Sequence, residues 1–79
     1  MQHKLQIREG ILKRLRESRG IPSEDVQARM MGVDRTTLRR VDNGGQPSAA
    51  FIVGMFVAFG MGPGEAFEVV PGLPLRAVA

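Results

Sequence analysis

Apolar residues recur at helical spacing near the beginning of the chain. The spacing predicts a first helix whose buried face carries Ile7, Ile11, Leu12 and Leu15, with charged residues on its other faces. Gly20 is placed to end this helix, because glycine readily adopts the left-handed conformation that follows a last helical turn. No stretch of the chain gives a convincing pair of strands.

Three short polar residues mark where later helices begin. Ser23, Asp34 and Ser48 each precede a stretch with helical apolar spacing. A side-chain oxygen at this position accepts from the free N–H groups of the first turn. The predicted second helix ends by Gly32, the third ends at the "NGG" sequence, and the fourth runs to about Phe59.

These elements predict an all-α fold of four to five short helices. Seventy-nine residues suffice for one small core, but not for a regulatory part and an enzymatic part together. We assign residues 1–68 to the helical domain, with "PGEAFEVV" supporting a short last helix. Two prolines in "PGLPLRAVA" argue against regular structure, so residues 69–79 are predicted to be an irregular tail.

The composition excludes several kinds of site. The chain has no cysteine, so neither a disulfide nor a thiolate metal site can form. Its single histidine, His3, lacks the clustered ligands that zinc requires, and no serine has a base to activate it. We therefore expect no enzymatic activity, no cofactor, no metal and no small-molecule substrate.

The apolar run over residues 49–61 is too short to cross a bilayer, which takes about 20 residues. Charged residues interrupt the apolar ones throughout the first 17 residues, which does not fit a signal peptide. We expect a buried helix over residues 49–61, no membrane partner and a cytoplasmic location.

Basic residues are concentrated in the first half of the chain. Residues 1–44 hold ten of the 11 lysines and arginines and six of the eight acidic residues. The remaining residues are apolar and slightly acidic. This asymmetry suggests a polyanion-facing surface built on a separate core.

Residues 26–31, the turn "MGV" and residues 35–41 have the elements of a helix-turn-helix motif. The second helix of such a motif enters the major groove of DNA. Leu38 and Val41 should point inward, which leaves exposed Arg35, Thr36, Arg39 and Arg40. Arginine can donate paired hydrogen bonds to guanine, and threonine can contact a thymine methyl group or a phosphate. We predict that these four residues contact bases.

Three segments carry a family resemblance: "LRESRG", "GVDRTTLRRVDNG" and "PSAAFIVGMFVAFGMGPGEAF". In that order they resemble successive parts of Cro/repressor-type helix-turn-helix domains, the lambda-repressor-like, XRE-class fold. The resemblance covers about Ile7 to Phe67, and the block ending in acid-Asn-Gly is its most specific part.

The resemblance implies a set of roles for individual residues. It implies base contacts by Arg35, Thr36 and Arg40. It implies phosphate contacts by Ser23, Thr37 and Asn43. It also implies an ion pair between Arg16 and Asp42 that would fix the third helix against the first.

The chain departs from the family at the predicted second helix. Glu24 stands where members often have a glutamine that binds a phosphate, and a carboxylate would repel one. The segment from Gly20 to Asn43 is also one residue longer than usual. The sequence leaves open which turn holds the extra residue, and whether Gln27 or Ala28 takes the small buried position.

The predicted fourth helix is apolar on all sides. We expect one face to fill the core: Ile52, Met55, Phe56 and Phe59. The opposite face has no polar residue: Ala50, Val53, Gly54, Val57 and Met61. A helix that is apolar all round is buried all round. Either residues 69–75 or a second subunit should cover this face, and we favour a homodimer.

The predicted function is sequence-specific binding of a double-stranded DNA operator by a transcriptional regulator. By resemblance, the context is a Cro-like phage or prophage repressor in a bacterial host cell. The alternative is an antitoxin or adaptor that binds another protein through the fourth helix and the tail. The DNA-binding hypothesis requires that Arg35 and Arg40 do not fold back onto the protein's own carboxylates.

Overall fold

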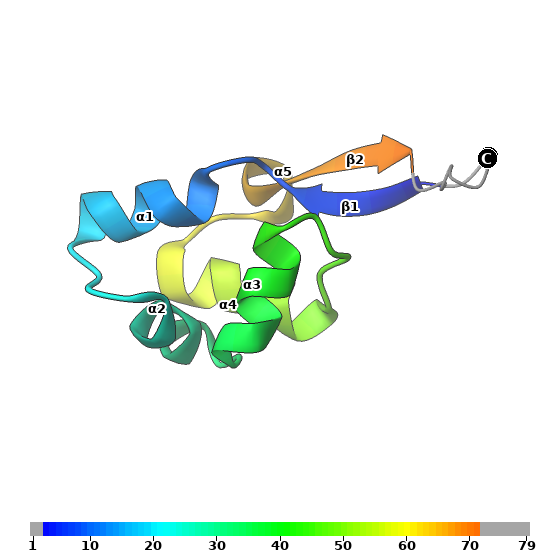
Figure 1. Cartoon of the computed structure of the whole chain (residues 1–79). Helices are drawn as coiled ribbons and strands as arrows, with labels where there is room; N and C mark the ends of the chain where they lie inside the picture. Colours follow the sequence, from blue (N-terminus) through cyan, green and yellow to red (C-terminus); the bar gives the residue numbers. More distant parts are fainter. Residues whose placement is uncertain (1–2, 72–79) are drawn as a thin grey trace.

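Five helices and a two-stranded sheet make up the computed structural model, which describes residues 3–71 (Figure 1). In chain order they are β1 (His3–Ile7), α1 (Ile11–Arg19), α2 (Glu24–Met31), α3 (Arg35–Asp42), α4 (Ala49–Phe59), α5 (Pro63–Ala66) and β2 (Phe67–Pro71). The helices agree with the predicted fold class, but the sheet means that the chain is not all-α.

The sheet is an antiparallel ribbon that joins the two ends of the described chain. Leu5 pairs with Val69 and Ile7 with Phe67. Ile7 therefore lies in a strand and not in the first helix, and α1 begins only after Gly10, whose φ is +77°. Residues 69–71 form the end of β2 and not an irregular tail. The rest of the predicted tail lies outside the described residues.

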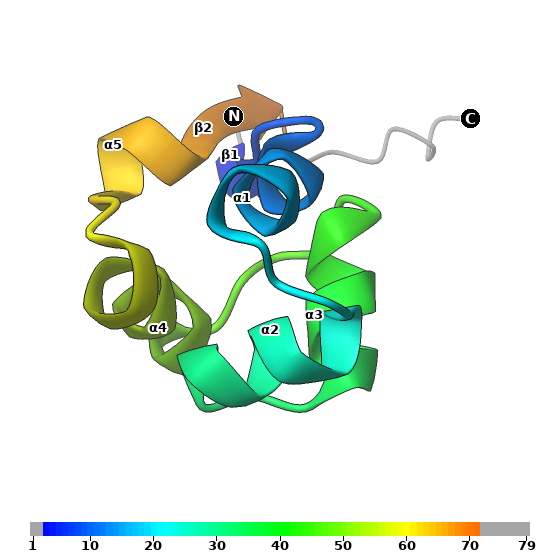
Figure 2. The ribbon, with the colours of Figure 1, turned by 90° about the vertical axis from the view of Figure 1, so that its left-hand side faces the viewer.

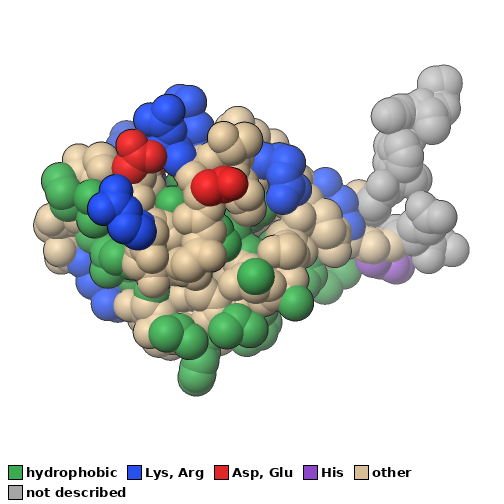
Figure 3. Space-filling model, turned by 90° about the horizontal axis from the view of Figure 1, so that it is seen from below, with side chains coloured by type: hydrophobic (Ala, Val, Ile, Leu, Met, Phe, Trp, Pro, Cys, Tyr) green, Lys and Arg blue, Asp and Glu red, His purple; other side chains and the backbone are tan. Residues whose placement is uncertain are grey.

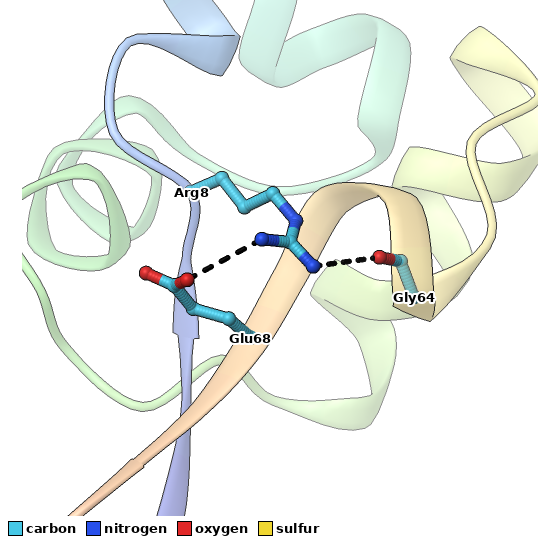
Figure 4. A network of polar contacts seen from close by, with 3 residues as sticks. All are labelled: Arg8, Gly64 and Glu68. Carbon is cyan, nitrogen blue, oxygen red and sulfur yellow. Dashed lines mark hydrogen bonds and ion pairs between the residues drawn. The ribbon is translucent and has the colours of Figure 1, made fainter.

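Arg8, which directly follows β1, contacts residues of α5 and β2 (Figure 4). Its guanidinium lies 3.3 Å from a carboxylate oxygen of Glu68 in β2 and donates to the carbonyl of Gly64 in α5 at 3.1 Å. Its backbone N–H donates to the carbonyl of Ala66 at 2.9 Å. The ribbon is thus attached to α5 by contacts from both side chain and backbone.

The predicted helix starts are confirmed by their caps. Ser23 Oγ accepts from the N–H of Val26 at 3.2 Å, and Ser48 Oγ accepts from the N–H of Phe51 at 3.2 Å. Asp34 Oδ1 accepts from the N–H of Thr37 at 2.7 Å. Each cap satisfies a donor that the first helical turn leaves free.

The core lies between the helices and one face of the ribbon. Its largest fully buried apolar side chains are Phe51, Phe67, Leu12, Leu38, Met55 and Val41. Leu38 and Val41 point inward, as predicted for α3. In α4 the prediction is wrong in part, because Phe51 is buried while Phe56 is 61% exposed and Ile52 is half-buried.

The orientation of α4 follows from its close approach to α2. Helix α2 lies between α3 and α4 (Figure 2), and it contacts both. Gly54 is buried against Met31, whose carbonyl oxygen occupies the space that a side chain at position 54 would need. Gly54 therefore does not belong to the open face of α4, contrary to prediction.

We predict that Gly54→Ala destabilises the protein by about 1–3 kcal/mol, because the added methyl group must push α2 and α4 apart. The measurement is the free energy of unfolding in urea. Gly64→Ala is the matched control, because a Cβ there meets no atom within 4 Å. If both variants unfold like the parent, α2 and α4 do not approach as closely as described.

Candidate nucleic-acid interface

Helices α2 and α3 pack against each other and are joined by the three residues 32–34. Gly32 ends α2 in the left-handed conformation, with φ of +77°, and Asp34 caps the start of α3. One face of α3 packs inward through Leu38 and Val41, and its other faces stay open. The two helices thus lie side by side, and α3 packs on the core.

A buried glutamine joins this unit to α1. Gln27 is fully buried, and its Nε2 donates to the carbonyl of Leu12 at 3.0 Å. Its Oε1 accepts from Nη1 of Arg16 at 2.8 Å. The sequence left open whether Gln27 or Ala28 is buried. Both are buried, and the side chain of Gln27 is directed toward α1.

This arrangement replaces the predicted ion pair between Arg16 and Asp42. Within residues 3–71 no ion pair joins these two side chains, because the guanidinium of Arg16 is bound to the amide of Gln27. The sequence analysis missed Gln27 as the link between α1 and α2. The only signal was a polar residue at an inward position of a short helix.

The four predicted base-contacting residues lie together on the open side of α3. Arg35, Thr36, Arg39 and Arg40 are all exposed, and Thr37 is half-buried behind them. They occupy the first six positions of the helix, which is the part that a recognition helix presents to base edges. The structure therefore assembles these donors on one surface.

Two of the three arginines face carboxylates of α2. Nη1 of Arg35 lies 3.6 Å from Oδ2 of Asp25, and Nε of Arg39 lies 3.2 Å from Oε1 of Glu24. The condition that Arg35 is free of the protein's own carboxylates is therefore not met. Arg40 meets it within residues 3–71, since it donates to the carbonyl of Gln46 at 3.3 Å and makes no ion pair.

The Arg35–Asp25 pair is exposed, and in the Arg39–Glu24 pair the arginine is exposed while Glu24 is half-buried, which limits the strength of both. The side chains of Arg35 and Asp25 are 54% and 55% exposed. Exposed pairs contribute about 0.2–1 kcal/mol, since water screens the charges and holding two side chains costs entropy. A ligand that offers each guanidinium a comparable acceptor can therefore compete with the carboxylate.

Two of the three predicted phosphate contacts flank the pair of helices α2 and α3. Ser23 is exposed at the start of α2, and Asn43 is exposed at the end of α3. A polar recess between these helices is lined by Glu24, Arg39, Asp42 and Asn43. The recess holds two carboxylates and one guanidinium, so it is less basic than the sequence analysis implied.

The ribbon supports the C-terminal end of α3. Lys4 of β1 donates from Nζ to the carbonyl of Gly44 at 2.7 Å, directly after α3. The Gln6 side chain lies against the same glycine. This support was missed because the sequence analysis predicted no strand.

A second surface, on α4 and the end of α2, is apolar. Its exposed large side chains are Met30, Val53, Phe56 and Val57. Figure 3 shows hydrophobic side chains gathered along one edge of the molecule, away from most of the charged ones in that view.

The residues predicted to form a dimer or tail-packing face do not all lie on the exposed side of α4. Ala50, Val53 and Val57 are exposed, but Gly54 is buried. Met61 is half-buried and lines a recess together with Ile11 and Leu15 of α1.

Within the described chain, no helix is long and apolar enough to cross a membrane. Among the same residues, no group of three histidine or acidic side chains is arranged to hold a metal ion.

Comparison with protein-family models, curated proteins and solved structures gives no match. The family resemblance therefore stays a prediction that rests on the quoted residues.

We predict that protonation of Asp34 weakens α3. The N–H of Thr37, and then the Thr37 side chain, hold the pKa of Asp34 below its ordinary value of 3.8. A lowered folded pKa stabilises the protein above pH 3.8, and this contribution is lost as the pH falls through the folded pKa.

The measurement is urea unfolding from about pH 6 to about pH 2, with an NMR titration of the Asp34 carboxyl carbon. Asp34→Asn keeps a capping oxygen but does not titrate, so its stability should fall less in acid than that of the parent. Parallel pH profiles for the two proteins would contradict the assignment.

Proposed function

We propose that the protein is a sequence-specific DNA-binding regulator that inserts α3 into the major groove. The observation that supports this most strongly is the exposed face of Arg35, Thr36, Arg39 and Arg40 on a helix held by the core. Arginine is the side chain that most often reads guanine in the major groove. Because Leu38 and Val41 anchor the opposite face, α3 meets a duplex as a rigid element.

Arg40 is the strongest candidate for a base contact. Its only described polar partner is a backbone carbonyl of Gln46, so base contact breaks no ion pair. We assign phosphate contacts to Ser23, Thr37 and Asn43, of which Ser23 and Asn43 are exposed. Phosphate contacts fix the position of the protein, and base contacts select the sequence.

The proposed role is Cro-like. A protein of this kind acts by occupying an operator, where it obstructs polymerase or displaces a competing regulator. The phage or prophage context, and with it the cytoplasm of a bacterial host, rests on the family resemblance alone.

We propose that a second copy of the chain covers the apolar face of α4. Val57 and Phe56 are 74% and 61% exposed, and α4 has no charged residue to solvate this face. Helices α3 and α4 lie on opposite sides of α2 (Figure 2), so a partner on α4 leaves α3 open. Paired subunits would suit two half-sites about 34 Å apart, one turn of DNA.

The same apolar face supports the second candidate function. An antitoxin or adaptor would use Val53, Phe56 and Val57 to bind a different protein. A monomer in solution that binds no duplex selectively would favour this alternative.

We predict that selection from a random duplex pool yields a preferred sequence, and that Arg40→Ala weakens binding to it by about 1–3 kcal/mol. Base preference should relax at one position, while binding to random duplex changes less. Affinity should also fall steeply with salt, because bound phosphates release counterions.

Lys13→Ala is the control for the selection experiment, because it removes one positive charge from α1 without touching α3. Equal weakening of Arg40→Ala on selected and random duplex would assign Arg40 to the phosphates. Failure to select any sequence would contradict the proposed function.

We predict that Val57→Lys converts a dimer into a monomer in sedimentation experiments, because it places a charge in the apolar contact. Val69→Lys is the control, since Val69 is comparably exposed but lies on β2. A parent protein that is monomeric at all concentrations, or a Val57→Lys variant that stays dimeric, would rule out this interface.

A further inference from the structure

The acidic residues at the start of α2 lie beside the arginines that should read DNA. Asp25 faces Arg35 at 3.6 Å and Glu24 faces Arg39 at 3.2 Å. Both pairs join the first turn of α2 to the exposed side of α3. The four side chains together carry no net charge.

A neutral surface gains little from the negative potential around a duplex. Non-specific binding depends almost entirely on phosphates neutralised by lysine and arginine. A phosphate that approaches Arg35 or Arg39 also approaches a carboxylate of like charge. The two carboxylates therefore disfavour binding of these arginines to the phosphates of the DNA backbone.

A base edge is a different ligand, because guanine O6 and N7 are uncharged acceptors. A guanidinium has five N–H donors, and Arg39 uses its Nε toward Glu24, which leaves both Nη groups free. Arg39 can thus stay paired with Glu24 through Nε while its Nη groups donate to a guanine. The carboxylate restricts the guanidinium to fewer orientations, so less conformational entropy is lost when the arginine binds a base.

We propose that Glu24 and Asp25 determine specificity by suppressing phosphate binding through Arg39 and Arg35, and that Glu24 also positions Arg39 for a base edge. This inference rests on the proposed DNA-binding function. Glu24 is a positioning residue, and both acids act through the arginines that they face.

The test compares the parent with the double variant Glu24→Ala/Asp25→Ala on the selected duplex and on a random duplex, over a series of salt concentrations. Freeing two arginines for phosphates should strengthen random-duplex binding about tenfold to sixtyfold near 0.1 M salt. The slope of log affinity against log salt should steepen by about 1–2. The ratio of selected to random affinity should fall by about fivefold or more, because the selected complex already uses these arginines on bases.

Glu9→Ala/Glu17→Ala is the matched control. It changes the net charge equally, but neither residue lies on α2 or α3. Equal strengthening of both duplexes, or a random-duplex affinity like that of the control, would overturn the inference.

A second comparison separates action through Arg39 from a structural effect. In an Arg39→Ala background, Glu24→Ala should no longer strengthen random-duplex binding beyond the control, whereas an effect that persists would overturn the positioning role. The single variants Glu24→Ala and Asp25→Ala serve if the double variant unfolds. A parent that prefers no sequence contradicts both proposals, whereas a selective parent whose ratio the variants do not change contradicts only this one.

Discussion

The structure depends on the way α2 is fixed between its neighbours. On one side, the buried amide of Gln27 binds the carbonyl of Leu12 and the guanidinium of Arg16. On the other side, Gly54 lets α4 reach the carbonyl of Met31. Leaving the buried amide of Gln27 without hydrogen-bond partners would cost free energy. Few other positions of α2 relative to α1 would keep both of its hydrogen bonds. Since the turn after α2 leads directly into α3, this constraint also fixes the direction in which α3 faces.

The surface has one charged region, on α2 and α3, and one apolar region, on α4. The arginines of α3 are exposed, but the first turn of α2 neutralises two of them, and Arg40 remains the one without an acidic partner in the described chain. On the other side of α2 from α3, the face of α4 around Val57 is apolar and uncharged. The charged face of α3 and the apolar face of α4 lie on opposite sides of α2, so the two proposed partners, DNA and a second subunit, would not compete for the same surface.

Local signals predicted the helices well, and long-range contacts explain the errors. Ser23 and Asp34 cap their helices because a cap needs only neighbouring residues. The pairing of Ile7 with Phe67 joins residues far apart in sequence, so no local pattern revealed the ribbon. In α4 every face is apolar, so the pattern could not show that Phe56 faces outward. The α3 surface was predictable from the motif, but its pairing with the acids of α2 depends on how the two helices cross.

The proposed function requires that α3 enters the major groove with its arginines directed at bases. Intermolecular nuclear Overhauser effects between the isotope-labelled protein and its selected duplex test this most directly. The side chains of Arg35 and Arg40 should show contacts to major-groove base protons, while Val53 and Val57 of α4 show none. Contacts confined to α1 or α4, or contacts from α3 only to sugar protons, would contradict the claim.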